Sequence, residues 1–101
     1  MAYEFVVGMN VIDETGYQKY REAMAPILAE HGGGFRYDFV VAKTLQSASQ
    51  HPITRVFAIY FGSLELSKAF FANPAYLKIR QTYFEPAVQG STVIAAYDRA
   101  D

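Results

Sequence analysis

The sequence predicts an α+β fold in which helices cover one face of a four-stranded antiparallel sheet. Near-continuous apolar runs at 3–11 and 55–62 indicate strands. They recur every three or four positions through 17–31, which indicates an amphipathic helix. With a second helical segment after Ser63 and a last strand at 91–97, the order is β-α-β-β-α-β, the order of ferredoxin-like folds.

The first helix has a clear start, apolar face and end. Residues 13–16 supply turn and N-cap chemistry, and glycines 32–34 end the helix. Its apolar stripe consists of Tyr17, Tyr20, Met24, Ile27, Leu28 and His31. Pro26 lies inside this stretch and lacks a backbone donor, so we expect a kink or a break near Met24.

A hairpin follows the first helix. Its strands are predicted at 35–45 and 53–62, joined by a polar loop at 46–52. The loop contains His51, which we expect to be solvated.

The second helical segment is predicted in two parts. Ser63 can cap a short helix, and Asn73 followed by Pro74 resembles a cap and first-turn proline of the next. Pro86 disfavours helix at the residue before it, so we expect this helix to end near Glu85.

Length, charge and cysteine content exclude several classes of protein. A chain of 101 residues fits one domain, residues 1–101. Because 9 Lys+Arg oppose 10 Asp+Glu, we expect neither a nucleic-acid nor a membrane partner. The absence of cysteine excludes disulfides and thiolate metal sites. Without a basic, apolar leader or a membrane-length apolar stretch, the expected location is the cytoplasm.

The predicted strands are apolar on both faces. In the first strand, one side carries Tyr3, Phe5, Val7, Met9 and Val11, and the other carries Val6 and Gly8. In the third, Phe57, Ile59 and Phe61 oppose Val56, Ala58 and Tyr60. Two short helices cover only one face of a small sheet, and strands of this kind are covered on both. We therefore expect the second face to meet another copy of the chain, or, less favoured, a ligand or nucleic acid.

Two groups of residues are arranged as in a known family. The first is Asp13, Tyr17, Tyr20, Pro26 and the run 30–33 before an aromatic residue, and the second is 63–71, Asn73, Pro74, Tyr76, Ile79 and Arg80. This pattern resembles domain-of-unknown-function family 1330. The resemblance implies a homodimeric α+β barrel with one small cavity per subunit, in a superfamily that includes cofactor-independent quinol monooxygenases and muconolactone isomerases.

The chain departs from this family pattern at two places. The family has a glycine-rich stretch after the arginine of the second strand, where this chain has residues 36–39. This chain also lacks an arginine that the family has late in the second helix, and Tyr83 or Phe84 lies near its place.

His31 is the candidate catalytic residue. It lies on the apolar stripe of the first helix, and an imidazole can transfer a proton near neutral pH. The alternative is structural, because a histidine in the last turn of a helix interacts well with the terminal carbonyl groups.

Charged residues of the second and third predicted strands are candidate ligand-binding groups. Arg36 and Asp38 alternate on one face of the second strand, where they would hold an anionic or enolic substrate. The alternative is protection of an edge strand or a salt bridge between subunits. Arg55 has the same two interpretations.

The chain is rich in aromatic residues, with 8 Tyr and 8 Phe. Hydroxyl groups on surfaces expected to be buried need a partner or a ligand, and they belong to Tyr17, Tyr20, Tyr60 and Tyr83. A pocket walled by such residues suits a flat, hydrophobic, oxygenated small molecule.

The sequence analysis favours cofactor-independent proton transfer or oxygenation of a small aromatic or enolic compound. His31 would act as general acid/base, Arg36 or Arg55 would hold an anionic oxygen, and Asp38 or Tyr60 would orient the ligand. No metal site and no cofactor are expected, because the histidines lie far apart in the sequence. The alternatives are a non-catalytic small-molecule binder and an RNA-binding sheet, which residues 55–61 faintly resemble.

Overall fold

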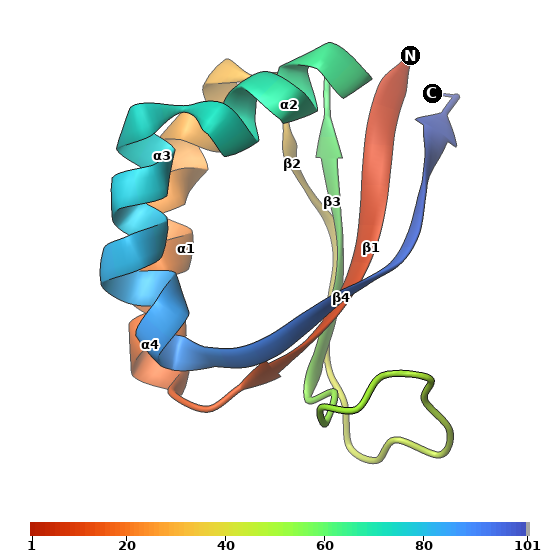
Figure 1. Cartoon of the computed structure of the whole chain (residues 1–101). Helices are drawn as coiled ribbons and strands as arrows, with labels where there is room; N and C mark the ends of the chain where they lie inside the picture. The colour runs from red at the N-terminus through yellow and green to blue at the C-terminus, as the bar shows by residue number, and fades with distance from the viewer. Residues whose placement is uncertain (101) are drawn as a thin grey trace.

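The structure, a computed structural model, describes residues 1–100 and has the predicted ferredoxin-like order (Figure 1). Its elements are β1 (Ala2–Val11), α1 (Glu14–Glu30), β2 (Gly34–Val40), β3 (Arg55–Phe61), α2 (Leu64–Ala72), α3 (Pro74–Ile79), the π-helical turn η1 (Arg80–Phe84), α4 (Glu85–Ala87) and β4 (Val88–Arg99). The strands pair antiparallel in the order β2-β3-β1-β4. All the helices lie on one side of the sheet. We call the covered side the inner face and the opposite side the outer face.

Helix α1 packs against the inner face as its periodicity predicts. Its buried residues are Tyr17, Tyr20, Met24 and Leu28. Asp13 caps the helix by accepting a hydrogen bond from the Gly16 backbone. The expected break is wrong, because α1 continues through Pro26 to Glu30. Because Pro26 has no N–H, the carbonyl of Glu22, four residues earlier, has no hydrogen-bond donor within the helix. Both residues are exposed, so water can donate to that carbonyl instead.

The helices of the second half begin as predicted and end slightly later. Ser63 accepts a hydrogen bond from the Leu66 backbone, and Asn73 caps the next helix immediately before Pro74. The helical segment continues through Pro86 to Ala87, two residues beyond the expected end. Within this segment, Arg80–Phe84 form the π-helical turn η1, which was not predicted from the sequence.

Strand β2 is shorter than predicted and contains an irregularity. It ends at Val40 rather than at 45, and its pairing with β3 shifts register between Phe35 and Tyr37. The irregularity breaks the alternation of side chains, so Arg36 reaches a partner on the outer face while Asp38 pairs opposite Phe57 on the inner face. The prediction that Arg36 and Asp38 share one face is therefore wrong.

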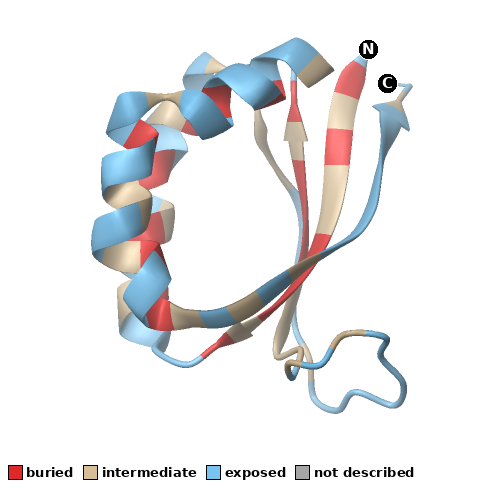
Figure 2. Cartoon of the chain, viewed as in Figure 1, coloured by how far each residue is buried: buried red, intermediate tan, exposed pale blue. Residues whose placement is uncertain are grey.

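The hydrophobic core lies between the helices and the inner face. It includes Val7 and Met9 of β1 and Phe57, Ile59 and Phe61 of β3. Figure 2 shows buried positions on β1, on β3 and on the sides of the helices that face the sheet, whereas β4 is exposed along most of its length.

The outer face carries large apolar side chains that no helix covers. Tyr37 and Phe39 of β2 are 50% and 56% exposed, and their rings stack with centroids 5.9 Å apart. Ile94 of β4 is 53% exposed and lies over Gly8. The outer face thus carries large apolar side chains without a covering helix, as the strand pattern predicts.

The loop at 41–54 is anchored to the end of the sheet beside β4. Ile53 packs over Gly8, where an added Cβ would lie 3.1 Å from the Ile53 Cδ1 atom. His51 Nε2 lies 2.7 Å from the Thr92 hydroxyl. Gly90 has a φ of 113°, and a Cβ there would lie 2.5 Å from His51 Cγ. His51 therefore connects the loop to β4 and is not simply solvated as expected.

Candidate ligand cavity

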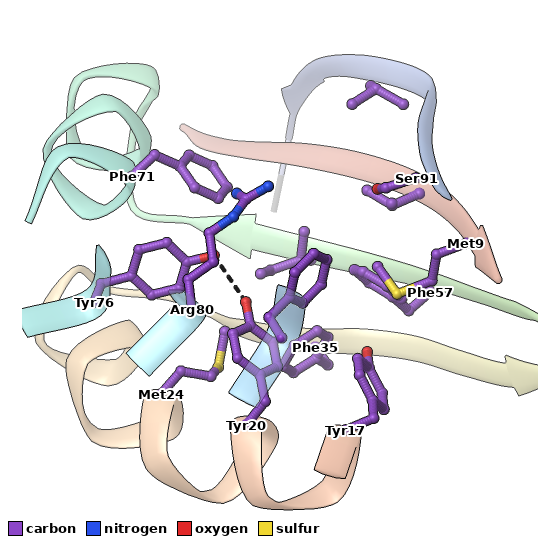
Figure 3. Close-up of a pocket in the computed structure, with 14 residues that line it drawn as sticks. Met9, Tyr17, Tyr20, Met24, Phe35, Phe57, Phe71, Tyr76, Arg80 and Ser91 are labelled. Atoms are coloured by element: carbon purple, nitrogen blue, oxygen red, sulfur yellow. Dashed lines mark hydrogen bonds between the residues drawn. The ribbon is translucent and has the colours of Figure 1, made fainter. Parts of the chain in front are cut away.

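A cavity of ≈ 310 Å³ lies between the helices and the inner face. Half of its 14 lining residues are aromatic: Tyr17, Tyr20, Phe35, Phe57, Phe71, Tyr76 and Phe84 (Figure 3). The polar atoms come from the three tyrosines, Arg80 and Ser91. An apolar wall with a few polar groups is the usual composition of a small-molecule site, and this volume is at the lower end of the usual range.

Two buried tyrosines form a hydroxyl pair in the wall of the cavity. The hydroxyl oxygens of Tyr20 (α1) and Tyr76 (α3) are 2.8 Å apart. Burial, followed by the interaction with Tyr76, strongly raises the pKa of Tyr20. Tyr20 therefore stays protonated at neutral pH. Because one hydroxyl proton bridges the two oxygens, the other remains for donation to a ligand.

Tyr17 is the candidate binding residue that lines the cavity. Its hydroxyl accepts a hydrogen bond from Arg21 Nε at 2.9 Å, and burial raises its pKa. Arg21 in turn lies over the Phe35 ring, 3.5 Å from its centroid. Tyr17 is thus held in place by a cation that stacks behind the cavity wall.

Arg80 is the charged residue of the cavity lining. It begins the π-helical turn η1, and its guanidinium carbon lies 4.9 Å from the centroid of the Phe84 ring. Figure 3 shows its side chain extending from the helix toward the strands, beside Phe71. Arg80 was not among the candidate site residues predicted from the sequence. Only its place in the family-like run at 79–80 pointed to it.

The rim of the cavity is formed at the edge strand β4. Val93 is 57% exposed and Ser91 is also exposed, and both residues line the cavity. Phe71, 39% exposed, lies on the opposite side at the end of α2. The exposed part of the cavity lining therefore lies at β4 and at the end of α2.

His31 lies at the end of α1, outside the cavity lining. Its Nδ1 is 2.7 Å from the carbonyl oxygen of Ile27, one turn earlier, and its ring meets Phe70 edge-on at 5.6 Å. A contact of this kind, with a carbonyl group in the last turn of the helix, is the one expected if His31 has a structural role.

Asp38 and Arg55 pair with each other on the inner face. Arg55 donates two hydrogen bonds to the carboxylate, each 2.8 Å long, and Arg21 Nη2 lies 2.9 Å from Asp38 Oδ2. The hydrogen bond from Arg55 lowers the pKa of Asp38. These charges join α1, β2 and β3 behind Tyr17 and do not line the cavity.

Arg36 binds a buried carboxylate on the outer face. Arg36 Nε and Nη2 donate to Glu4 at 2.8 and 2.7 Å, Arg99 Nη1 donates at 3.1 Å, and the Tyr97 hydroxyl donates a short hydrogen bond. Glu4 is fully buried, and it was not among the residues predicted from the sequence to form a site.

The two remaining candidate tyrosines also lie outside the cavity lining. Tyr60 is on the outer face, with the Arg99 guanidinium 4.6 Å from its ring centroid. Tyr83 is half-buried and packs against the core.

Residues 1–100 contain neither a metal-binding group of three or more His, Asp or Glu residues nor a helix long and apolar enough to cross a membrane.

Solved structures of several bacterial proteins have the same architecture. A protein of unknown function from Rhodopseudomonas palustris superposes with a TM-score of 0.81 at 14% identity, over 99% of this chain and 83% of that chain. A dabb family protein with a ferredoxin-like fold from Mesorhizobium loti gives 0.64 at 11% identity, over 99% and 98%. A dimeric protein of unknown function and ferredoxin-like fold from Bacteroides fragilis gives 0.60 at 12% identity, over 97% and 96%.

These similarities establish the fold. Comparison with curated proteins gave no match. The sequence itself matches the family described as Domain of unknown function (DUF1330) over residues 2–97, which is nearly the whole chain. The protein therefore belongs to the DUF1330 family.

Proposed function

We propose that the protein is a homodimer that binds a small, flat, oxygen-bearing organic molecule in the cavity of each subunit. The observation that carries this proposal is the convergence of the Tyr20–Tyr76 hydroxyl pair on an aromatic cavity of ≈ 310 Å³. An apolar cavity of about 150 Å³ holds benzene, so the space here suits a molecule of one or two rings.

The outer face supports the dimeric part of the proposal. Tyr37, Phe39 and Ile94 form exposed apolar surface on the two edge strands, and no helix covers it. In a two-fold symmetric dimer the same surface of each subunit forms the interface, so these apolar side chains become buried in both subunits. The similar Bacteroides fragilis protein is described as dimeric.

The arrangement argues against the alternative of an RNA-binding sheet. That alternative depended on aromatic residues of the third strand being displayed for stacking on bases. Phe57 and Phe61 instead face the helices, 6% and 0% exposed, and the Tyr60 ring on the outer face is in contact with the Arg99 guanidinium. Small-molecule binding is the function that their placement favours.

A catalytic role is a second candidate, favoured by the state of the hydroxyl pair. A neutral, buried hydroxyl is a hydrogen-bond donor aimed at a fixed point, which stabilises an oxyanion as it develops on an enolised substrate. Quinols and enol-lactones are therefore the substrates to test. Tyr76→Phe removes one of the two hydroxyls, and we expect turnover to fall about 100-fold, as for loss of one oxyanion donor. Oxygen uptake and ultraviolet absorbance measure the two reactions, and unchanged turnover would exclude this role.

Blocking the rim of the cavity tests the binding function directly. Val93→Trp places an indole at the cavity edge, and we expect affinity for two-ring compounds to fall about tenfold or more through steric exclusion. Because Val93 is 57% exposed, the change in the free energy of unfolding should stay near 0.5 kcal/mol. Ligand-observed NMR measures the affinity.

Val40→Trp is the matched control for this experiment. Val40 is 75% exposed on β2 and does not line the cavity, so the same substitution there should leave binding unchanged. Equal binding by Val93→Trp and the unsubstituted protein would place the ligand elsewhere and overturn the proposed site.

A further inference from the structure

The positive charge in the cavity lining indicates which class of small molecule the cavity would bind. Resting on the proposed binding function, we infer that the ligand is a small aromatic or enolic monocarboxylate whose carboxylate is held by Arg80. Three observations carry this inference: the isolation of Arg80 from other charges, its position in the cavity wall, and the polar groups that share the wall with it.

Arg80 is unlike the other arginines of the chain. Each of the others reaches a carboxylate: Arg21 and Arg55 reach Asp38, and Arg36 and Arg99 reach Glu4. Within residues 1–100, the guanidinium of Arg80 has no ion pair and no hydrogen bond, and its contact is with the face of the Phe84 ring. Its donors are therefore available to a bound anion.

The position of Arg80 directs these donors to the cavity. It starts η1, and a π-helical turn inside an α-helix is a frequent feature of functional sites. Phe84, one turn later, lines the same cavity and lies under the guanidinium. The ring thus supports the charge from one side and leaves the edge of the guanidinium free to bind.

The remainder of the lining fits an anion of this kind. The lining contains no Asp or Glu, so the charge of Arg80 is not compensated within the wall. The planar guanidinium matches a carboxylate through two parallel hydrogen bonds. The Tyr20–Tyr76 pair adds a neutral donor for an oxygen, and the aromatic wall accepts the ring.

Isosteric probes separate charge from shape. We would titrate 1-naphthoate and 1-naphthamide, which have the same ring and nearly the same volume but differ in charge, and follow binding by ligand-observed NMR. Molecules of this size bind with dissociation constants of about 1 mM, which this method detects. We expect the unsubstituted protein to prefer the carboxylate by about tenfold or more, the scale of a charge-assisted bidentate contact.

The variants assign the preference to Arg80. Arg80→Gln should make the two probes bind equally by weakening the carboxylate and leaving the amide unchanged, whereas Arg80→Lys should keep part of the preference because it retains the charge. Lys78→Gln removes the same charge from an exposed position on α3 and should change neither affinity. Thermal melting shows whether each variant is folded.

The outcomes distinguish this inference from the proposed function. Equal binding of the two probes to the unsubstituted protein, or a preference that survives in Arg80→Gln, would overturn the carboxylate assignment while cavity binding stands. Failure of both probes, and of the uncharged two-ring compounds, to bind at all would overturn the proposed function together with the inference.

Discussion

Replacing Phe39 with aspartate is expected to convert the proposed dimer into a monomer. Phe39 is 56% exposed on the outer face, and two-fold symmetry would place two copies of the new carboxylate in one interface. A buried charge without a partner costs about 3–5 kcal/mol, and each 1.4 kcal/mol weakens association about tenfold. Light scattering coupled to size-exclusion chromatography measures the mass directly.

The control for this experiment is an equally drastic change elsewhere on the surface. Leu77 is 47% exposed on α3, and this helix lies on the opposite side of the sheet from the outer face. Leu77→Asp should therefore remain dimeric. An unsubstituted protein that elutes as a monomer would contradict the dimer outright, and its exposed aromatic sheet would then have to be tested for RNA binding.

Replacing Glu4 with glutamine is expected to lower the free energy of unfolding by about 2–3 kcal/mol, because the buried negative charge that pairs with two arginines is removed. The carboxylate of Glu4 is fully buried and accepts hydrogen bonds from Arg36, Arg99 and Tyr97. Glutamine keeps the shape of the side chain and removes its charge, which leaves the two arginines facing each other. Urea unfolding measures the loss, at a fixed protein concentration because the proposed dimerisation would also contribute to stability.

The same carboxylate makes stability depend on acid pH. The hydrogen bond from Arg36 is the largest cause that lowers the pKa of Glu4 from 4.5 to about 2. The unfolded chain therefore binds the proton first, so the stabilisation is complete above pH 4.5 and is lost as the pH falls toward 2. Because the Arg36 side chain is 41% exposed and solvent screens its charge, we expect the loss to be about 1–2 kcal/mol.

This pH dependence separates the charge of Glu4 from its packing. Glu4→Gln should show a smaller loss of stability between pH 4.5 and 2 than the unsubstituted protein. The Asp38–Arg55 pair remains in both proteins and accounts for part of the acid sensitivity of each. Glu22→Gln, on the exposed side of α1, should behave as the unsubstituted protein. Parallel pH curves for Glu4→Gln and Glu22→Gln would show that the fold does not lower the pKa of Glu4.

The fold was predictable from the sequence where the periodicity of side chains is regular. The stripe that includes Tyr17 and Met24 is buried as predicted, and the alternation along β1 and β3 correctly separates the inner from the outer face. The irregularity at Arg36 was not predictable, because neither Gly nor Pro marks it. Gly90 was expected to precede the last strand, yet it lies within β4, where its missing Cβ makes room for His51.

The candidate site was predictable only in part. The requirement that a buried hydroxyl has a partner indicated Tyr20, and the structure supplies that partner as Tyr76. Arg80 was missed because the second helical segment has two possible faces and no regular stripe that assigns one to the sheet. Glu4 was missed because its partners come from β2 and β4, far away in the sequence.

The π-helical turn η1 also affects how related sequences should be compared. A π turn holds one residue more than the α-helical turn that it replaces, so each residue after it is rotated by about 100° relative to an uninterrupted helix. Arg80 and Phe84, at the two ends of η1, both line the cavity, whereas Tyr83 between them does not. Positions aligned one-to-one through this turn therefore need not be equivalent in space.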